Sequence, residues 1–135
     1  MNKKIMAIGT IVLMLITGLI CVPIVSSIER EIGTIYADLG RRGNERPIVT
    51  LNGSYHTRNR YFIIGGTAKA GENFGRFRGI FSNNRFVIRL YIGGNIFTIV
   101  GKCRFDKETQ MFRGIWIGRG IPIRGWITGS YTSID

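Results

Sequence analysis

Hydrophobic and polar residues alternate along most of the chain that follows Pro47. In the segment 48–57, for example, Val49, Leu51 and Tyr55 occupy alternate positions and polar residues stand between them. Successive side chains of a β-strand point to opposite faces of a sheet, so a period of two predicts strands with one apolar face. This segment is therefore predicted to be a strand.

Six further strands are predicted by the same criterion, at residues 61–67, 74–82, 85–92, 96–105, 111–118 and 123–131. The first of these is apolar at positions of both faces, which predicts a strand covered on both sides, followed by a loop at 68–73. The Asn83-Asn84 and Gly93-Gly94-Asn95 connections tolerate the positive φ angles of tight hairpins. Short turns require antiparallel neighbours, so we predict an all-β meander of seven or eight strands that closes as a small barrel or folds as a coiled sandwich.

The sequence Phe-Arg-Gly-Ile-Phe at 77–81 recurs 35 positions later as Phe-Arg-Gly-Ile-Trp at 112–116. Glycine beside an aromatic residue lets a sheet curve sharply while the ring covers the gap. The repeat therefore indicates architecture, and the period of two assigns its rings and glycines to the core. The predicted core face contains Phe77, Gly79, Phe81, Phe86, Ile88, Leu90, Ile92, Phe97, Ile99, Gly101, Cys103, Phe105, Phe112, Gly114, Trp116, Ile123, Gly125, Ile127, Gly129 and Tyr131.

The N-terminal segment 1–27 begins with Lys3 and Lys4 and continues as an uncharged, mostly apolar run over 5–25. It is typical either of a cleaved signal peptide or of an uncleaved membrane anchor. Both alternatives place the remaining chain outside the cytoplasm, as a secreted or membrane-anchored protein. Residues 28–46 are a linker, a short helix or stalk, or a first strand near 33–38, and 47–135 form the predicted antiparallel β domain.

The chain of 135 residues carries 19 Lys and Arg against 8 Asp and Glu, a formal net charge of +11. On the face opposite the predicted core, basic residues occupy positions on all of the last five strands. They are Arg76, Arg78, Arg85, Arg89, Lys102, Arg104, Arg113 and Arg124. Tyr91 and Trp126 are the aromatic candidates on this face, which also carries Ile80, Val87, Val100, Ile115 and Ile117. Guanidinium groups pair in bidentate fashion with phosphate, sulfate and carboxylate, so this face is a candidate anion-binding surface.

The sequence predicts no catalytic residue set, metal site or cofactor, and hence no enzyme and no small-molecule substrate. His56 is the only histidine, and it falls beside a predicted turn, where a surface position is expected. The carboxylates lie in or near predicted loops and termini. Cys103 falls on the core face, where a buried thiol behaves as a small apolar side chain.

The strand at 112–116 and the following strand, Gly-Trp-Ile-Thr-Gly-Ser-Tyr at 125–131, share a spacing of glycine and aromatic residues. This pair resembles small exported archaeal β-proteins of unknown function, in which a Phe-x-Gly-x-Trp strand precedes a strand ending in Gly-x-Tyr. The resemblance covers only the C-terminal part of the chain. It implies a β domain behind a signal or an anchor and implies no catalytic residues.

Three functions remain open for the basic face and for the interior. The first is binding of an anionic polymer or membrane surface, such as lipid headgroups, acidic glycans or nucleic acid. The second is a structural or assembly role in the cell envelope, with the same face buried between copies of the chain. The third, a carrier with a ligand inside the barrel, conflicts with the large rings on the predicted core face. A solvated face, with arginine stems lying over Ile and Val, requires no function at all.

Overall fold

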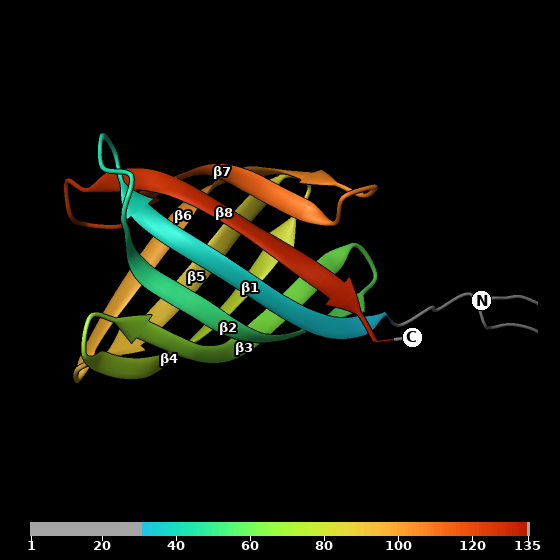
Figure 1. Cartoon of the computed structure of the whole chain (residues 1–135), viewed down its shortest axis with the longest axis horizontal. Coiled ribbons are helices and arrows are strands. Elements are labelled where there is room, and N and C mark those ends of the chain that lie inside the picture. The colour runs from blue at the N-terminus through green and yellow to red at the C-terminus, as the bar shows by residue number, and fades with distance from the viewer. Residues whose placement is uncertain (1–30, 135) are drawn as a thin grey trace, which may run out of the picture.

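A computed structural model of the protein describes residues 31–134, which form a closed barrel of eight antiparallel strands (Figure 1). Each strand pairs with its neighbours in sequence, and β8 pairs with β1. The strands are β1 (Ile32–Arg41), β2 (Pro47–Arg58), β3 (Tyr61–Ala70), β4 (Asn73–Ser82), β5 (Arg85–Ile92), β6 (Asn95–Asp106), β7 (Met111–Gly118) and β8 (Arg124–Ser133). Closure leaves no unpaired sheet edge, and of the two predicted forms of the meander the barrel is confirmed.

Tight turns connect the strands and set their register. Asn83 and Asn84 have φ angles of 49° and 70°, and Gly93 and Gly94 have φ angles of 60° and 81°. Two consecutive residues with positive φ form the turn whose twist matches that of the flanking strands. Both hairpins that the sequence predicted at these positions are confirmed.

Of the alternatives for residues 28–46, a strand is correct for 32–41. This strand, β1, closes the ring between β2 and β8. The segment 1–27, predicted to be a signal peptide or an anchor, lies outside the described residues. Within residues 31–134, no helix is long and apolar enough to cross a membrane.

The inward side chains form one core, which includes most of the predicted core face. The buried apolar residues are Ile35, Ala37, Leu39, Val49, Leu51, Tyr55, Ile64, Ala68, Phe77, Phe81, Phe86, Ile88, Leu90, Ile92, Ile99, Cys103, Phe112, Trp116, Ile127 and Tyr131. The strands and this core are complete within residues 31–134, so the barrel forms one structural unit. Eight strands enclose a space just wide enough for side chains to fill.

Three predictions about the core and β3 are wrong. Phe97 was assigned to the core but is 40% exposed, because it lies next to the β5–β6 turn, at the rim of the barrel. Strand β3 was expected to be covered on both sides, yet Tyr61 is 45% exposed, since only one face of a barrel strand points inward. The loop expected at 68–73 is only the two residues between Ala70 and Asn73, and β3 and β4 extend to meet them.

Aromatic rings cover glycines on the paired strand, as the repeat at 77–81 and 112–116 suggested. Phe86 pairs with Gly101, and a Cβ atom added to Gly101 would lie 2.7 Å from the Phe86 ring. Trp116 pairs with Gly125 in the same way, at 2.7 Å. In each case the ring occupies the space that a larger residue would need, and the glycine lets the strands curve.

Both described chain ends lie at the same end of the barrel (Figure 1). A cluster of inward-facing rings packs together near that end. Phe105 is at its centre, with its ring centroid 5.4 Å from those of Phe62 and Phe81 and 5.2 Å from that of Phe112. Tyr131 joins the cluster at 5.8 Å from Phe105. These rings occupy the space in which a carrier of this shape would hold a ligand.

Candidate anion-binding surface on the outer wall

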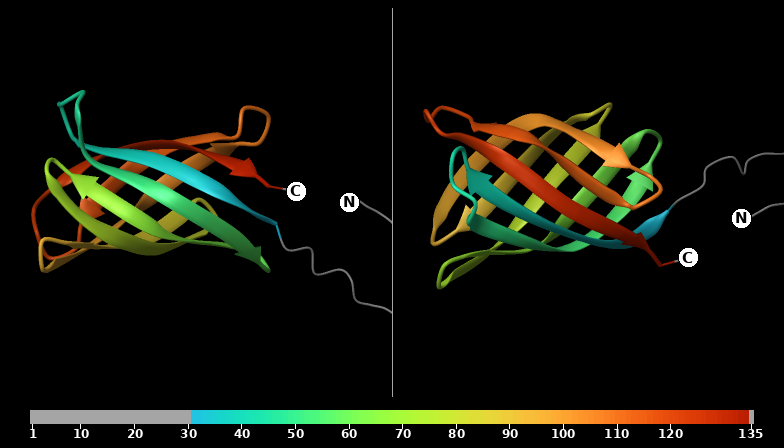
Figure 2. Two further views of the ribbon diagram at one scale, coloured as in Figure 1. Left: turned by 60° about the horizontal axis from the view of Figure 1, so that its bottom comes forward. Right: turned by 45° about the horizontal axis from the view of Figure 1, so that its top comes forward.

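All eight basic residues singled out in the sequence are exposed on the outer side of the barrel. Seven of them lie on β4–β7 and one, Arg124, at the start of β8. We call the outer side of β4–β7, together with Arg124, the cationic wall. Figure 2 shows that these four strands are consecutive in the ring, so the wall is continuous.

Six of these side chains form three directly opposed pairs on neighbouring strands. The pairs are Arg78 with Arg89, Arg85 with Lys102, and Arg104 with Arg113. Like charges directly opposite one another destabilise a sheet. In the part of the chain that the structure describes, no carboxylate lies within ion-pair distance of any of the six. The surface therefore concentrates positive charge that is not paired with a carboxylate within residues 31–134.

The eight basic residues do not converge on a single point. Arg76 stands apart from the pairs, with its guanidinium carbon 5.5 Å from the centre of the Tyr91 ring, against which it lies. Arg124 is opposite an aliphatic residue, Ile117. The barrel is curved, so a flat partner would meet only some of the pairs at one time.

A row of aliphatic side chains crosses the cationic wall between the basic pairs. Each member is directly opposite the next one in the row, from β3 to β7: Ile63, Ile80, Val87, Val100 and Ile117. We call these five residues the aliphatic row. Ile80, Val87 and Ile117 are 47%, 48% and 52% exposed, which is unusual for neighbouring apolar side chains on a surface that faces water.

The sequence analysis did not place Ile63 on this surface. The missing signal was the length of the β3–β4 turn. A two-residue turn at Gly71 and Glu72 fixes the register that sets Ile63 opposite Ile80.

Two shallow hollows lie on either side of Val87, which lines both. One, of about 310 Å³, also includes Ile80 and the Arg78 and Arg89 pair. The other, of about 440 Å³, includes Val100 and the Arg85 and Lys102 pair. Each hollow is thus lined by aliphatic side chains and by one opposed pair of cations, and Tyr91 also lines the smaller one.

The two predicted ring contacts already have packing partners within the barrel. Trp126 donates its indole N–H to the carbonyl oxygen of Asn44 at 2.8 Å, and its ring covers Gly40. Tyr91 lies under the guanidinium of Arg76. A role of these rings in binding a ligand stays a prediction, and the geometry gives each of them a structural role.

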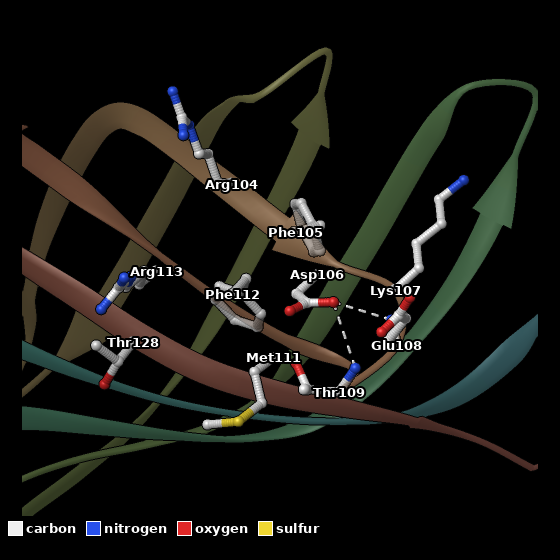
Figure 3. A pocket seen from close by; sticks show the side chains of 10 residues that line it. All are labelled: Arg104, Phe105, Asp106, Lys107, Glu108, Thr109, Met111, Phe112, Arg113 and Thr128. Atoms are coloured by element: carbon white, nitrogen blue, oxygen red, sulfur yellow. Dashed lines mark hydrogen bonds between the residues drawn. The ribbon is translucent and has the colours of Figure 1, made fainter.

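A third hollow, of about 760 Å³, lies beside the β6–β7 turn and is lined by the third basic pair, Arg104 and Arg113 (Figure 3). Its lining also includes Asp106 and Glu108. The Asp106 carboxylate accepts hydrogen bonds from the backbone N–H groups of Glu108 at 3.0 Å and of Thr109 at 3.4 Å, as the dashed lines in Figure 3 show. The acidic groups make this hollow less favourable for an anion than the two beside Val87.

The outer side of β8, β1 and β2 has a different composition. Its side chains are mostly small and hydroxylated, and we call it the hydroxyl wall: Thr34, Tyr36, Asp38, Thr50, Asn52, Ser54, Thr128, Ser130 and Thr132. Asp38 accepts hydrogen bonds from the Thr50 hydroxyl at 3.0 Å and the Tyr36 hydroxyl at 3.3 Å. Burial, followed by the Asp38 charge, raises the pKa of Tyr36 above its usual value.

The remaining reactive side chains do not assemble into a site. Cys103 is buried and 3% exposed, as expected, and burial raises the pKa of its thiol to about 12. His56 is exposed on β2, as expected. Within residues 31–134, no three side chains of the metal-binding types His, Cys, Asp and Glu lie together.

Comparisons of this chain with models of protein families, with curated proteins and with solved structures found no match.

Proposed function

We propose that this protein acts outside the cytoplasm as a binding protein without catalytic activity, and that its cationic wall holds anionic partners. The partner classes are lipid headgroups, acidic glycans and nucleic acid. The observation that carries this proposal is the set of three opposed cationic pairs without a carboxylate within ion-pair distance. An arrangement that costs folding stability is understandable where an anion relieves the repulsion.

The residue type supports the same conclusion. Of the 19 basic residues, 14 are Arg, and seven of the eight on the surface are Arg. The guanidinium group offers a planar fork of donors that matches phosphate, sulfate and carboxylate, and it is more weakly hydrated than an ammonium group. Solubility alone would not require this preference.

Charge reversal tests the proposal. The double variant Arg85→Glu with Arg89→Glu should bind heparin, an oligonucleotide and phosphatidylglycerol vesicles about tenfold or more weakly at low salt, and wild-type binding should weaken steeply as salt rises. The control, Arg58→Glu with Arg60→Glu, makes the same change of charge at the β2–β3 turn, outside the cationic wall. Equal losses in both variants, or wild-type binding that is indifferent to salt, would contradict the proposal.

A second candidate function is self-association through the aliphatic row, as in a subunit of the cell envelope. The half-exposed Ile80, Val87 and Ile117 favour it, because a second copy could cover them. Sedimentation or native mass measurement over a range of protein concentrations would decide. A strict monomer at high concentration excludes this function.

A further inference from the structure

We infer that the partner of the cationic wall is the surface of an anionic lipid bilayer, and that the aliphatic row enters the boundary between headgroups and acyl chains. This inference rests on the proposed function and adds the class of partner to it. The central contact consists of Ile80, Val87 and Val100. Its cationic borders are the Arg78 and Arg89 pair on one side and the Arg85 and Lys102 pair on the other.

The order of residues along β5 fits the layers of a bilayer surface most directly. Arg85, Val87 and Arg89 occupy successive outward positions of this strand, about 7 Å apart. On the neighbouring strands only one flank is basic, since Ile80 lies between Arg78 and Ser82 on β4, and Val100 between Thr98 and Lys102 on β6. The aliphatic side chains therefore have one opposed basic pair on each side. A bilayer with anionic lipids presents phosphates at its surface and hydrocarbon just below, and a surface helix meets it with the same combination of basic and aliphatic groups.

The residue types of the aliphatic row favour lipid over nucleic acid as the partner. Proteins that bind single-stranded nucleic acid stack the bases on exposed aromatic rings. Here the residues between the cations are Ile and Val. Of the rings on this side of the barrel, Tyr91 lies against Arg76 and Trp126 covers Gly40. The more exposed ring of Phe74 lies at the start of β4, opposite Lys69 and not between the opposed pairs. Acidic glycans would be held by the cations but would leave the row without a partner.

The basic pairs also restrict how the barrel meets lipid. Arginine at the bilayer midplane on the outer side of a barrel is strongly unfavourable. The opposed pairs lie within the strands, so the wall suits contact with the surface of a bilayer and not passage through it. Long arginine stems can lie along the aliphatic side chains while their guanidinium groups stay at the level of the phosphates.

The sequence before the barrel brings a bilayer within reach. The uncharged run at 5–25 ends a few residues before β1 begins at Ile32. If this run is held in a membrane, the connecting residues span at most about 3.5 Å each. The barrel then stays close to the bilayer surface, where even weak contacts of the cationic wall are favoured by the high effective concentration.

A dye that senses polarity, attached through Val87→Cys in the full chain with Cys21→Ser, tests the inference. The buried Cys103 thiol should not label in the folded protein. On vesicles of phosphatidylcholine with phosphatidylglycerol, we expect a blue shift of the emission and quenching by lipid-attached quenchers, both reversed by salt. Vesicles of phosphatidylcholine alone should give neither change. A dye attached through Ile48→Cys, at an exposed position on β2 outside the cationic wall, should not respond on either vesicle.

A second variant separates insertion from charge. Ile80→Thr with Val87→Thr keeps the β-branched shape but shortens the apolar surface, and it should weaken binding to the anionic vesicles about three- to tenfold. The matched change outside the cationic wall, Ile48→Thr on β2, should leave the affinity within about twofold. The dependence of binding on salt should be the same in these variants and in the wild type, because no charge changes.

Other outcomes overturn the inference in distinguishable ways. If the wall binds heparin or an oligonucleotide through its arginines while the dye at position 87 does not respond to vesicles, the partner is a soluble polyanion and the proposed function stands. If the dye shifts without vesicles as the protein concentration rises, a second copy of the chain covers the row. If no anionic probe binds in a charge-dependent way, the inference and the proposed function both fail.

Discussion

The cationic wall and the hydroxyl wall are two sides of one barrel with similar interiors and different exteriors. Inside, both consist of apolar side chains and glycines, for example Phe86 opposite Gly101 on one side and Tyr55 opposite Gly33 on the other. Outside, the hydroxyl wall uses its polar groups locally, as Thr50 does with Asp38. The cationic wall opposes like charges, as Arg78 does with Arg89, and exposes aliphatic side chains between them.

The apolar interior is common to both walls and is required by the fold, whereas the exterior differs between them and can vary. Closure of eight strands demands the apolar interior on every side. The hydroxyl wall shows that three strands of the same barrel have an outer side made mostly of uncharged, polar side chains, with Asp38 as the charged exception. Closure of the ring does not by itself require the charges and exposed aliphatic side chains of β4–β7, which is why we propose the function there.

The first prediction tests that the interiors of the two walls are equivalent. An added Cβ would lie 2.0 Å from the Ile115 carbonyl oxygen at Gly101 and 2.1 Å from the Gly65 carbonyl oxygen at Gly53. Gly101→Ala and Gly53→Ala should each lower the free energy of unfolding by about 2–3 kcal/mol, because the strands must move apart. Denaturant unfolding followed by tryptophan fluorescence measures the effect.

Gly65→Ala is the matched control for both variants, since its nearest atom would be 3.5 Å away, an ordinary contact. It should be neutral or stabilising by up to about 1 kcal/mol. If only one of the two inward glycines proved sensitive, the two walls would not share an equivalent interior.

The ease of predicting each part of this molecule follows from the length of its turns. Where a two-residue turn was recognised, as at Asn83-Asn84, the strand limits and the opposed position of Arg78 and Arg89 follow from the sequence, because such a turn fixes every pair beyond it. At β3 the turn was taken to be six residues long, so its register remained undefined. Ile63 could not then be placed next to Ile80, and the aliphatic row went unrecognised as a continuous feature.

Alternation predicted which side chains point inward, but not how closely the outer ones approach each other. The eight basic residues were correctly placed on the outer face. Their division into three opposed pairs, with Arg76 and Arg124 apart, required the register of five strands at once. Phe97 shows a further limit, because alternation cannot tell a residue in the middle of a strand from one at the rim, where the interior ends.

The second prediction tests whether the cations on the outer side of the barrel lower the pKa of a thiol in its interior. Cys103 stands between Lys102 and Arg104 in sequence, and nearby cations normally lower the pKa of a thiol. In the barrel it points inward, and burial raises its pKa to about 12. Because the folded-state pKa lies above the value of about 8.5 expected in the unfolded chain, this group contributes stability below that pH and loses it as the pH rises toward about 12.

Between about pH 8.5 and about pH 12, the free energy of unfolding of the wild type should fall more steeply with pH than that of Cys103→Ala. The comparison concerns the slopes, so a difference in stability that does not depend on pH does not affect it. With Cys21→Ser as background, a thiol reagent at neutral pH should react with Cys103 only as fast as the barrel opens. Rapid reaction in the folded state would mean that the cations outside do lower the pKa of this thiol.

The third prediction concerns the cost of the opposed pairs. Arg78→Glu places a carboxylate opposite Arg89 and should raise the free energy of unfolding by about 0.5–1 kcal/mol at low ionic strength, an effect that salt should suppress. The same variant should weaken anion binding. The control on the hydroxyl wall, Thr34→Glu, has Ser54 and Thr132 as its cross-strand neighbours and should change stability little. A loss of stability on Arg78→Glu would show that the opposed arginines do not strain the folded state.

The fourth prediction has the smallest expected effect and concerns Asp38, which lies at the border between the hydroxyl wall and the cationic wall. Asp38 lies two cross-strand steps from Arg113, by way of Thr128. Asp38→Asn keeps an oxygen that can accept the Thr50 hydroxyl, so the free energy of unfolding at neutral pH should change by only about 0.5 kcal/mol or less. The pKa of Tyr36 should fall toward its usual value, because the neighbouring charge is gone. NMR titration of the Tyr36 ring measures this shift.

The affinity of Asp38→Asn for anionic vesicles tests whether the two walls are functionally separate. If the two walls are functionally separate, removal of the Asp38 charge leaves the affinity for anionic vesicles unchanged, even though Arg113 is nearby. A clear gain in affinity would mean that Asp38 limits the binding surface by repelling anions from its border. The hydroxyl wall would then be part of the device that orients the barrel on its partner, since an anionic group at one edge of a cationic surface favours the orientations that keep that edge away.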